Sequence, residues 1–256
     1  MTKILAITNQ KGGVGKTTTA VNLSACLAEI GRRVLLVDLD PQGNATTGCG
    51  VVKREAMPTV YEVLIGQADF NQARVKTEFG FDILPSNREL AGAEIELIDI
   101  DGREFRLRQA LAPILTEYDF VIIDCPPALN MLTVNGLTAA AAVMIPMQCE
   151  YYALEGLTDL VTTLKKVRGN LNRGLEIEGL LRTMYDPRST LTQQVSNELV
   201  EHFGHRVYNT IVPRNVRLAE APSYGKPVIA FDRNSKGAVA YMALAEEMLA
   251  RTDANA

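Results

Sequence analysis

The sequence predicts an α/β fold, in which a mostly parallel, twisted β-sheet is flanked by helices on both faces. Residues 4–8 form a short apolar run that ends in a polar, glycine-rich turn. Residues 16–30 follow with apolar side chains at helical spacing, and residues 34–37 form a second, wholly apolar run. A strand, a loop, a helix and another strand in this order are the repeating unit of a parallel sheet, which is normally covered on both faces.

The same alternation continues through the rest of the chain. Four further apolar runs predict strands, at residues 120–123, 142–146, 175–183 and 207–212. Apolar residues at helical spacing predict a helix that ends near Gly169 and a C-terminal helix at residues 238–249. Residues 51–108 follow neither period, and we expect them to decorate the core. Because there is no repeat or linker, residues 1–256 are expected to form a single domain.

The composition limits the classes of partner. The net charge is −4, whereas a protein that binds nucleic acid through its whole surface is usually basic. The first 150 residues hold 13 basic and 18 acidic side chains, and the remaining 106 hold 13 basic and 12 acidic. Any contact with a polyanion is therefore expected from a local patch, and the charge balance favours the later part of the chain.

The cysteines and the apolar stretches exclude two other classes. The four cysteines form no C-x-x-C pair, and His202 and His205 lie far from them, so zinc-ligand spacing is absent. Reduced cysteines and the lack of a signal peptide predict a cytoplasmic protein. The longest apolar stretch, residues 137–147, is shorter than the ~18 residues that a membrane span needs. It is interpreted as a buried strand together with the segment that leads into it.

A glycine-rich segment, Lys11-Gly12-Gly13-Val14-Gly15-Lys16-Thr17-Thr18, joins the first strand to the first helix. Its glycines let the backbone turn tightly and present N–H groups, and the N-terminus of the helix behind it favours negative charge. Lys16 is placed to reach the terminal phosphates of a nucleotide, and the Thr17 hydroxyl to hold Mg²⁺. The alternative, a tight turn without a ligand, leaves the lysine and threonine unexplained.

The start of this loop departs from the standard phosphate-binding pattern. Gln10 stands where that pattern has glycine, and an additional lysine follows as Lys11. Lys11 is poorly placed to reach the far phosphates of its own nucleotide. It is either a solvated surface lysine or a cation that reaches a phosphate across a dimer interface, like an arginine finger supplied in trans.

Three aspartates follow predicted strands: Asp38 and Asp40 come after the second strand, and Asp124 follows the strand at residues 120–123. Ligands of open α/β sheets bind at the carboxyl ends of the strands, so all three can converge on the glycine-rich loop. Asp124 suits support of Mg²⁺, with Asp38 behind it, and Asp40 suits positioning of an attacking water. The alternative is that these residues only cap the next element.

Together these segments resemble the deviant Walker-A ATPases, a branch of the P-loop NTPases. The resemblance rests on residues 11–18, on Asp38-Leu39-Asp40-Pro41-Gln42-Gly43-Asn44 and on Asp124-Cys125-Pro126-Pro127. Residues 150–156 and 212–225 extend it over nearly the whole chain, which is similar to the ParA/Soj branch of chromosome and plasmid partition proteins.

The resemblance implies a slow, Mg²⁺-dependent ATPase cycle that converts ATP and water to ADP and phosphate. ATP drives formation of a sandwich homodimer, in which Lys11 contacts the phosphates of the partner. The dimer binds non-specific double-stranded DNA, which implies a nucleoid-associated protein. A ParB-type partner stimulates hydrolysis and releases the dimer.

The resemblance also implies roles for individual residues. Asp40 becomes the hydrolytic aspartate and Thr17 a Mg²⁺ ligand, and Pro213 and Asn215 contact the adenine. Arg188 and Arg217 match positions that contact DNA in the family, although a solvated or salt-bridged arginine remains the alternative for each. Four other basic residues are further choices for the DNA-binding face: Lys165, Lys166, Arg168 and Lys236.

Three alternatives on the same fold are weaker. A MinD-like membrane-cycling ATPase needs a basic amphipathic C-terminal helix, but residues 243–256 carry three acidic residues and one arginine. An iron–sulfur reductase needs cluster cysteines in a glycine-rich setting, which Cys125 and Cys149 lack. A scaffold with a structural nucleotide leaves Asp40 unexplained. Because the loop begins at residue 11, an N-terminal helix-turn-helix domain is not expected.

Overall fold

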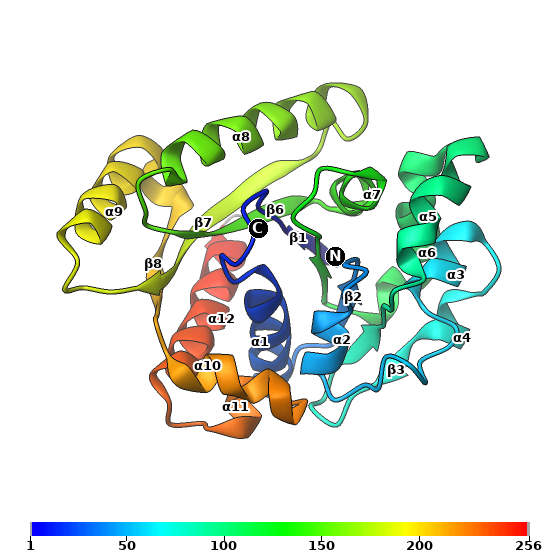
Figure 1. Cartoon of the computed structure of the whole chain (residues 1–256), viewed down its shortest axis with the longest axis horizontal. Helices are drawn as coiled ribbons and strands as arrows, with labels where there is room; N and C mark the ends of the chain where they lie inside the picture. The colour runs from blue at the N-terminus through cyan, green and yellow to red at the C-terminus, as the bar shows by residue number, and fades with distance from the viewer. Residues whose placement is uncertain (1, 255–256) are drawn as a thin grey trace.

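An eight-stranded sheet crosses the molecule in the computed structural model, which describes residues 2–254 (Figure 1). The strand order is β3-β4-β2-β5-β1-β6-β7-β8, and every neighbouring pair is parallel except β3 and β4. The strands are β1 (Lys3–Ile7), β2 (Val34–Asp38), β3 (Val75–Lys76), β4 (Asp82–Leu84), β5 (Phe120–Asp124), β6 (Ala142–Gln148), β7 (Glu176–Tyr185) and β8 (Val207–Pro213). The predicted fold class is confirmed.

Helices cover both faces of the sheet. In Figure 1, α7 (Met131–Ala139) and α8 (Ala153–Asn170) lie above the sheet, and α1 (Lys16–Glu29) and α12 (Lys236–Ala254) lie below it. Side chains of one strand alternate between the two resulting cores: Leu5 and Ile7 pack on the α1 side, and Ala6 packs on the α8 side. Both cores are apolar, which explains why the central strands read as continuous apolar runs.

The predicted elements outside residues 51–108 have bounds within a few residues of the observed ones, except α7. Residues 137–139 were expected to lead into a strand, but they form the last part of this helix. Leu132 and Leu137 are fully buried, and most of the helix is enclosed. A helix buried on nearly all sides has no polar face, and therefore no amphipathic period to read. The sequence also gave no prediction for α9 (Thr190–Phe203).

The expectation that residues 51–108 decorate the core is wrong. Strand β4 pairs with β2 inside the sheet, and three helices of this segment pack on it: α3 (Val60–Ile65), α5 (Leu90–Glu96) and α6 (Arg106–Leu111). Leu64, Leu90 and Leu107 are fully buried. Each helix has seven residues or fewer, which is too short for its period to be visible without the tertiary contacts.

Short elements complete the described chain. The remaining helices are α2 (Asn44–Gly48), α4 (Phe70–Ala73), α10 (Val216–Glu220) and α11 (Val228–Phe231). Turns of 3-10 helix lie at Leu97–Asp99, Arg103–Phe105, Ala112–Glu117, Gly204–Arg206 and Ala221–Tyr224. Within residues 2–254, no helix is long and apolar enough to cross a membrane.

The four cysteines, Cys26, Cys49, Cys125 and Cys149, are free and buried. Burial raises the pKa of Cys26 to about 12 and that of Cys149 to about 11. These thiols therefore behave as small apolar core side chains, as the sequence predicted.

Replacing Leu90 by Ala tests whether residues 51–108 belong to the core. We expect Leu90→Ala to lower the free energy of unfolding by about 2–5 kcal/mol, because a fully buried leucine is removed. Ile95 lies on the same helix but is 72% exposed, so Ile95→Ala is the matched control and should change stability by less than about 0.5 kcal/mol. Urea unfolding measures both. Equal effects of the two variants would contradict the packing described above.

Candidate functional site

The glycine-rich loop occupies the turn between β1 and α1. Gly13 has φ +74° and Gly15 has φ +87°, in the left-handed region that glycine adopts without strain. Gly15 is the N-cap of α1 and has no side chain to satisfy the first N–H groups of the helix. The loop therefore offers unpaired donors and the positive end of a 14-residue helix to an anion.

Lys16 is held within this loop. Its side chain is nearly buried, and its Nζ donates a hydrogen bond to the carbonyl oxygen of Lys11 at 3.0 Å. Burial lowers the pKa of Lys16, and the negative charges of Asp124 and Asp40 oppose this change. Two of the predicted site aspartates thus lie close enough to act on the Lys16 ammonium.

Asp124 is brought to the loop by strand pairing. It ends β5 and stands in register with Ile7 of β1 on one side and with Asp38 of β2 on the other. Its carboxylate is fully buried, and neither oxygen accepts a hydrogen bond. Burial raises the pKa of Asp124 well above its usual value, and the charge of Asp38 raises it further. The nearby Thr17 hydroxyl opposes this rise without reaching hydrogen-bond geometry.

An unpaired buried carboxylate beside a hydroxyl fits a hard cation. Buried charges are costly unless they are paired or bind a metal ion, and Mg²⁺ prefers carboxylate and hydroxyl oxygens. Asp124 and Thr17 supply both groups next to the loop that would hold phosphates. The residues present therefore fit Mg²⁺, and Asp124 is the residue whose environment most needs it.

Asp38 is equally buried but satisfied. One carboxylate oxygen accepts hydrogen bonds from the backbone N–H and the hydroxyl of Thr46, both at 2.8 Å, and the other accepts from the Asp40 N–H at 3.1 Å. Burial nevertheless raises the pKa of Asp38 to about 6. Asp38 thus fixes the loop that follows β2, whereas a part in metal binding stays a prediction.

Asp40 lies in this loop and is partly exposed. Its carboxylate accepts one hydrogen bond from the Gln42 N–H at 2.9 Å, so oxygen lone pairs stay available. Its backbone carbonyl accepts from the Ser86 hydroxyl and the Gly43 N–H. The side chain is free to act while the backbone is held.

Lys11 points away from its own loop. Its Nζ forms an ion pair with Glu150 at 2.6 Å, and both side chains are about half exposed. Such an exposed pair contributes about 0–1 kcal/mol, so it opens easily. Glu150 is a site residue that sequence reasoning did not single out, although it opens the quoted segment 150–156.

A cavity of about 240 Å³ lies on the other side of the loop from the aspartates. It is lined by residues of the loop and α1, the end of β7, residues 212–219 and α12: Gly15, Thr18, Thr183, Met184, Val212, Pro213, Arg214, Asn215, Leu218, Ala219 and Tyr241. The structure thus brings Pro213 and Asn215 to the cavity beside the loop, whereas their contact with adenine stays a prediction. The Asn215 Oδ1 is buried without a hydrogen-bond partner, so it can accept from an amino group of a base.

Two residues of β7 that line this cavity were not predicted from the sequence as site residues. The Thr183 hydroxyl donates to the Val14 carbonyl at 2.8 Å and ties β7 to the phosphate loop. Met184 has φ +47°, which is unusual for a residue other than glycine and is typical of functional sites. No local pattern in the sequence marks either residue, because their roles depend on where β7 lies in the sheet.

Arg188 and Arg217 do not line this cavity. The Arg188 side chain is 87% exposed and pairs with Asp186 at 2.8 Å. Arg217 is half exposed and pairs with Glu220 at 2.7 Å and Asp232 at 3.2 Å. Exposed ion pairs are weak, so both guanidinium groups can exchange these partners for an anion.

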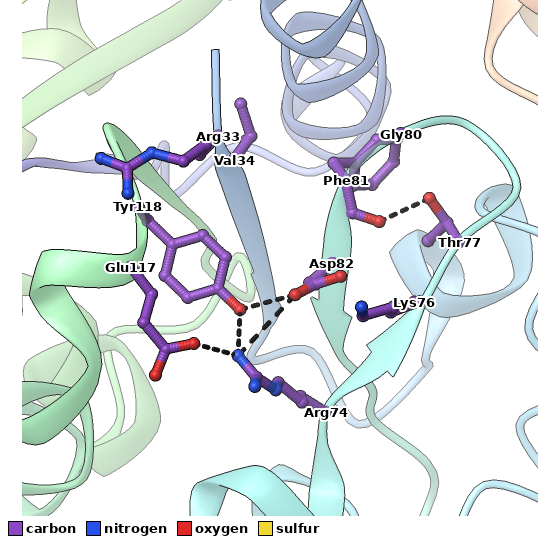
Figure 2. Close-up of a pocket in the computed structure, with 10 residues that line it drawn as sticks. All are labelled: Arg33, Val34, Arg74, Lys76, Thr77, Gly80, Phe81, Asp82, Glu117 and Tyr118. Atoms are coloured by element: carbon purple, nitrogen blue, oxygen red, sulfur yellow. Dashed lines mark hydrogen bonds and ion pairs between the residues drawn. The ribbon is translucent and has the colours of Figure 1, made fainter.

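A second cavity, of about 380 Å³, lies at the opposite end of the sheet (Figure 2). It is lined by residues at the starts of β2 and β4, including Arg33 and Asp82. Figure 2 shows the Arg74 guanidinium beside Glu117, Tyr118 and Asp82. Arg74 donates to Glu117 at 2.6 Å and to the Tyr118 hydroxyl at 2.9 Å, and that hydroxyl donates to Asp82 at 2.7 Å. These side chains satisfy one another's hydrogen bonds and thereby link the elements around the cavity. The cavity is remote from the phosphate loop.

Comparisons with known proteins agree with this geometry. Residues 2–177 match the family model described as an AAA domain. The chain is 55% identical to the sporulation initiation inhibitor protein Soj of Bacillus subtilis, over 98% of this chain and 99% of that protein. It is 53% identical to the chromosome partitioning protein ParA of Caulobacter vibrioides, over 97% and 94%.

The chain also resembles a solved structure along its whole length. That protein is named cobyrinic acid a,c-diamide synthase, comes from Mycobacterium smegmatis, and has an ATP analogue and magnesium bound. The TM-score is 0.88 at 40% identity, and the match covers 100% of this chain and 98% of that one. An anion-binding loop on this fold is thus compatible with a nucleotide.

Replacing Lys16 by Ala tests the phosphate loop. We expect Lys16→Ala to abolish ATP binding in equilibrium dialysis, because the β- and γ-phosphates lose their cationic partner. Lys76→Ala removes an exposed lysine at the opposite end of the sheet and serves as control. Retention of nucleotide by Lys16→Ala would show that the loop does not depend on this side chain.

Proposed function

The chain belongs to the ParA/Soj family of chromosome-partitioning ATPases, and from this premise we propose that it is an ATP-driven switch that binds DNA. The observation that carries the proposal is the unpaired, fully buried carboxylate of Asp124 beside the glycine-rich loop. That carboxylate has no role in the fold alone, since no group of the described chain satisfies it. A Mg²⁺ ion that accompanies ATP gives it one.

Each predicted residue has a place in nucleotide binding. The loop N–H groups and Lys16 hold the phosphates, and Thr17 and Asp124 hold Mg²⁺. Bound Mg²⁺ supplies positive charge that stabilises the phosphoryl group during transfer. Pro213 packs beside the base, and Asn215 accepts a hydrogen bond from its amino group. Relatives with solved structures contain an ATP analogue or ADP together with magnesium, which supports ATP and Mg²⁺ as the ligands.

Asp40 is proposed to orient the attacking water. Its carboxylate keeps free lone pairs at the carboxyl end of β2, and it lies close enough to affect Lys16. The water oxygen bonds to the γ-phosphorus, a water proton passes to the Asp40 carboxylate, and the bond from phosphorus to the bridging oxygen breaks. Lys16 faces the charge that develops on the phosphate oxygens. The products are ADP and phosphate. We propose slow turnover, because a switch must dwell in its ATP state.

Dimerisation is proposed to complete the site. Lys11 begins the phosphate loop, but its ammonium group pairs with Glu150 of the same chain. In an ATP-bound sandwich dimer it exchanges Glu150 for the phosphates of the partner, as the family resemblance implies. The exchange replaces a weak exposed pair by a contact with a highly charged group.

The dimer is proposed to bind non-specific double-stranded DNA and to be released when a ParB-type partner stimulates hydrolysis. Arg188 and Arg217 supply local positive charge on a chain whose net charge is −4. Two copies double the number of these contacts, so binding depends on the dimer. This gives the nucleotide control over DNA binding and places the protein on the nucleoid.

Two other functions are less well supported. A MinD-like membrane cycle is less well supported because residues 243–253 carry Glu246, Glu247 and Asp253 against Arg251, and anionic lipid repels acidic residues. A reaction that uses a cysteine thiolate as nucleophile is also disfavoured, because such a thiol is exposed and has a lowered pKa. The four cysteines are buried, and burial raises their pKa values.

Replacing Asp40 by Ala tests the catalytic assignment. We expect Asp40→Ala to keep ATP binding and dimerisation and to lower turnover by about 10²-fold or more, because the water loses its orienting base. Phosphate release measures turnover, and analytical ultracentrifugation measures the dimer. Asp101→Ala, at an exposed aspartate outside the site, is the control. Turnover of Asp40→Ala near that of the wild type would refute the water-positioning role.

Binding to a non-specific DNA duplex tests the function as a whole. We expect binding with ATP and not with ADP, and weaker binding at higher salt because phosphate contacts release counterions. Arg188→Ala and Arg217→Ala should each reduce the salt dependence by about one contact. Arg33→Ala is a matched control, since Arg33 is also an exposed arginine paired with an aspartate but lies at the other end of the sheet. If ATP-bound dimers form but do not bind DNA, the protein is a nucleotide switch and the proposed DNA binding is wrong.

A further inference from the structure

The loop after β2 is held by a buried chain of polar groups that reaches into the segment after β4. Ser86 follows β4 and is fully buried, as are Thr46 and Asp38. The Ser86 N–H donates to the Thr46 hydroxyl at 2.8 Å, and that hydroxyl donates to the Asp38 carboxylate at 2.8 Å. The Ser86 hydroxyl donates to the backbone carbonyl of Asp40 at 2.8 Å. These hydrogen bonds therefore link Asp38, at the end of β2, through Thr46 and Ser86 to the backbone of Asp40 in the loop that follows.

These bonds fix the Asp40 backbone from both sides. Its N–H donates to the Asp38 carboxylate at 3.1 Å, and its carbonyl accepts from the Ser86 hydroxyl and the Gly43 N–H. Of these three contacts, only the one from Ser86 comes from outside the loop and its preceding strand. Ser86 thus sets the position of Asp40 relative to the sheet, and the other two set the shape of the loop.

The loop and Ser86 also approach each other closely at Gly43. A Cβ at Gly43 would lie 2.7 Å from the Ser86 carbonyl oxygen, and Gly43 has φ +61°. The close approach means that a small movement of Ser86 is transmitted to the loop.

We propose that Ser86 is a positioning residue for ATP hydrolysis, which acts by holding the Asp40 carboxylate where it can orient the attacking water. The inference rests on the proposed function of Asp40. The Ser86 hydroxyl donates to the Asp40 carbonyl oxygen, so it acts through the Asp40 backbone. Its removal should therefore lower the rate of hydrolysis without weakening the binding of ATP, which depends on the loop at residues 11–18.

Ser86→Ala tests this inference by separating kcat from nucleotide affinity. We expect kcat to fall about five- to tenfold, which corresponds to the loss of one buried hydrogen bond from the transition state. The Kd for ATP, measured by equilibrium dialysis, should stay within about twofold of the wild-type value. Ser196→Ala is the matched control: it also removes a buried serine hydroxyl that forms one hydrogen bond, to Arg182, and should change neither quantity.

A second variant covers the case in which Ser86→Ala does not fold, which thermal unfolding reports. Ser86→Cys keeps nearly the same shape and leaves only a weak donor, so its kcat should fall in the same direction with unchanged ATP affinity. Wild-type kcat in a folded Ser86 variant, or an equal loss of ATP affinity, would overturn the inference.

Asp40→Ala, measured in parallel, separates this failure from failure of the proposed function. If Asp40→Ala stalls hydrolysis and Ser86→Ala does not slow it, only the positioning role of Ser86 is wrong. If Asp40→Ala turns over like the wild type, the water-positioning role itself is wrong and Ser86 has no catalytic group to position.

Discussion

Parallel pairing of β5 between β1 and β2 is the constraint on which the rest of the site depends. It aligns Ile7, Asp124 and Asp38, the last residues of three neighbouring strands. The glycine-rich loop and both aspartates therefore lie together at the carboxyl ends of these strands. Residues more than 80 positions apart in the chain thereby become neighbours. The apolar runs that form these strands are therefore as necessary for the site as the polar residues that end them.

This alignment forces two carboxylates to lie side by side in the interior, where each disfavours ionisation of the other. The structure treats them unequally. Asp38 accepts three hydrogen bonds from Thr46 and the Asp40 backbone, while Asp124 accepts none. A satisfied carboxylate can serve as an anchor, and an unsatisfied one stays available for a cation. Of two aspartates at equivalent strand ends, Asp38 therefore holds a loop, and Asp124 is the one proposed to bind the metal ion.

The sequence predicted most of what is local. The phosphate loop could be predicted from its glycines, Lys16 and Thr17, because their spacing is set by a single turn. The central strands could be predicted because both of their faces are apolar. It did not predict α7, which is enclosed on most sides, or the sheet and core contacts of residues 51–108, whose helices are very short. The contacts of Ser86, Thr183 and Glu150 were not predicted for a related reason. Each residue contacts a partner that only the tertiary structure brings close.

The contacts of Asp40 and Lys11 also indicate where control of hydrolysis lies. The backbone of Asp40 is fixed by hydrogen bonds that need neither nucleotide nor partner, so a single chain already holds its loop in place. Lys11 is different, because within the described residues 2–254 its ammonium pairs with Glu150, across an exposed and easily broken ion pair. A site in which the aspartate is set in advance and one cation is still turned away is incomplete in the single chain. In the proposed sandwich dimer, assembly completes the site, and dimerisation is then the step that controls hydrolysis.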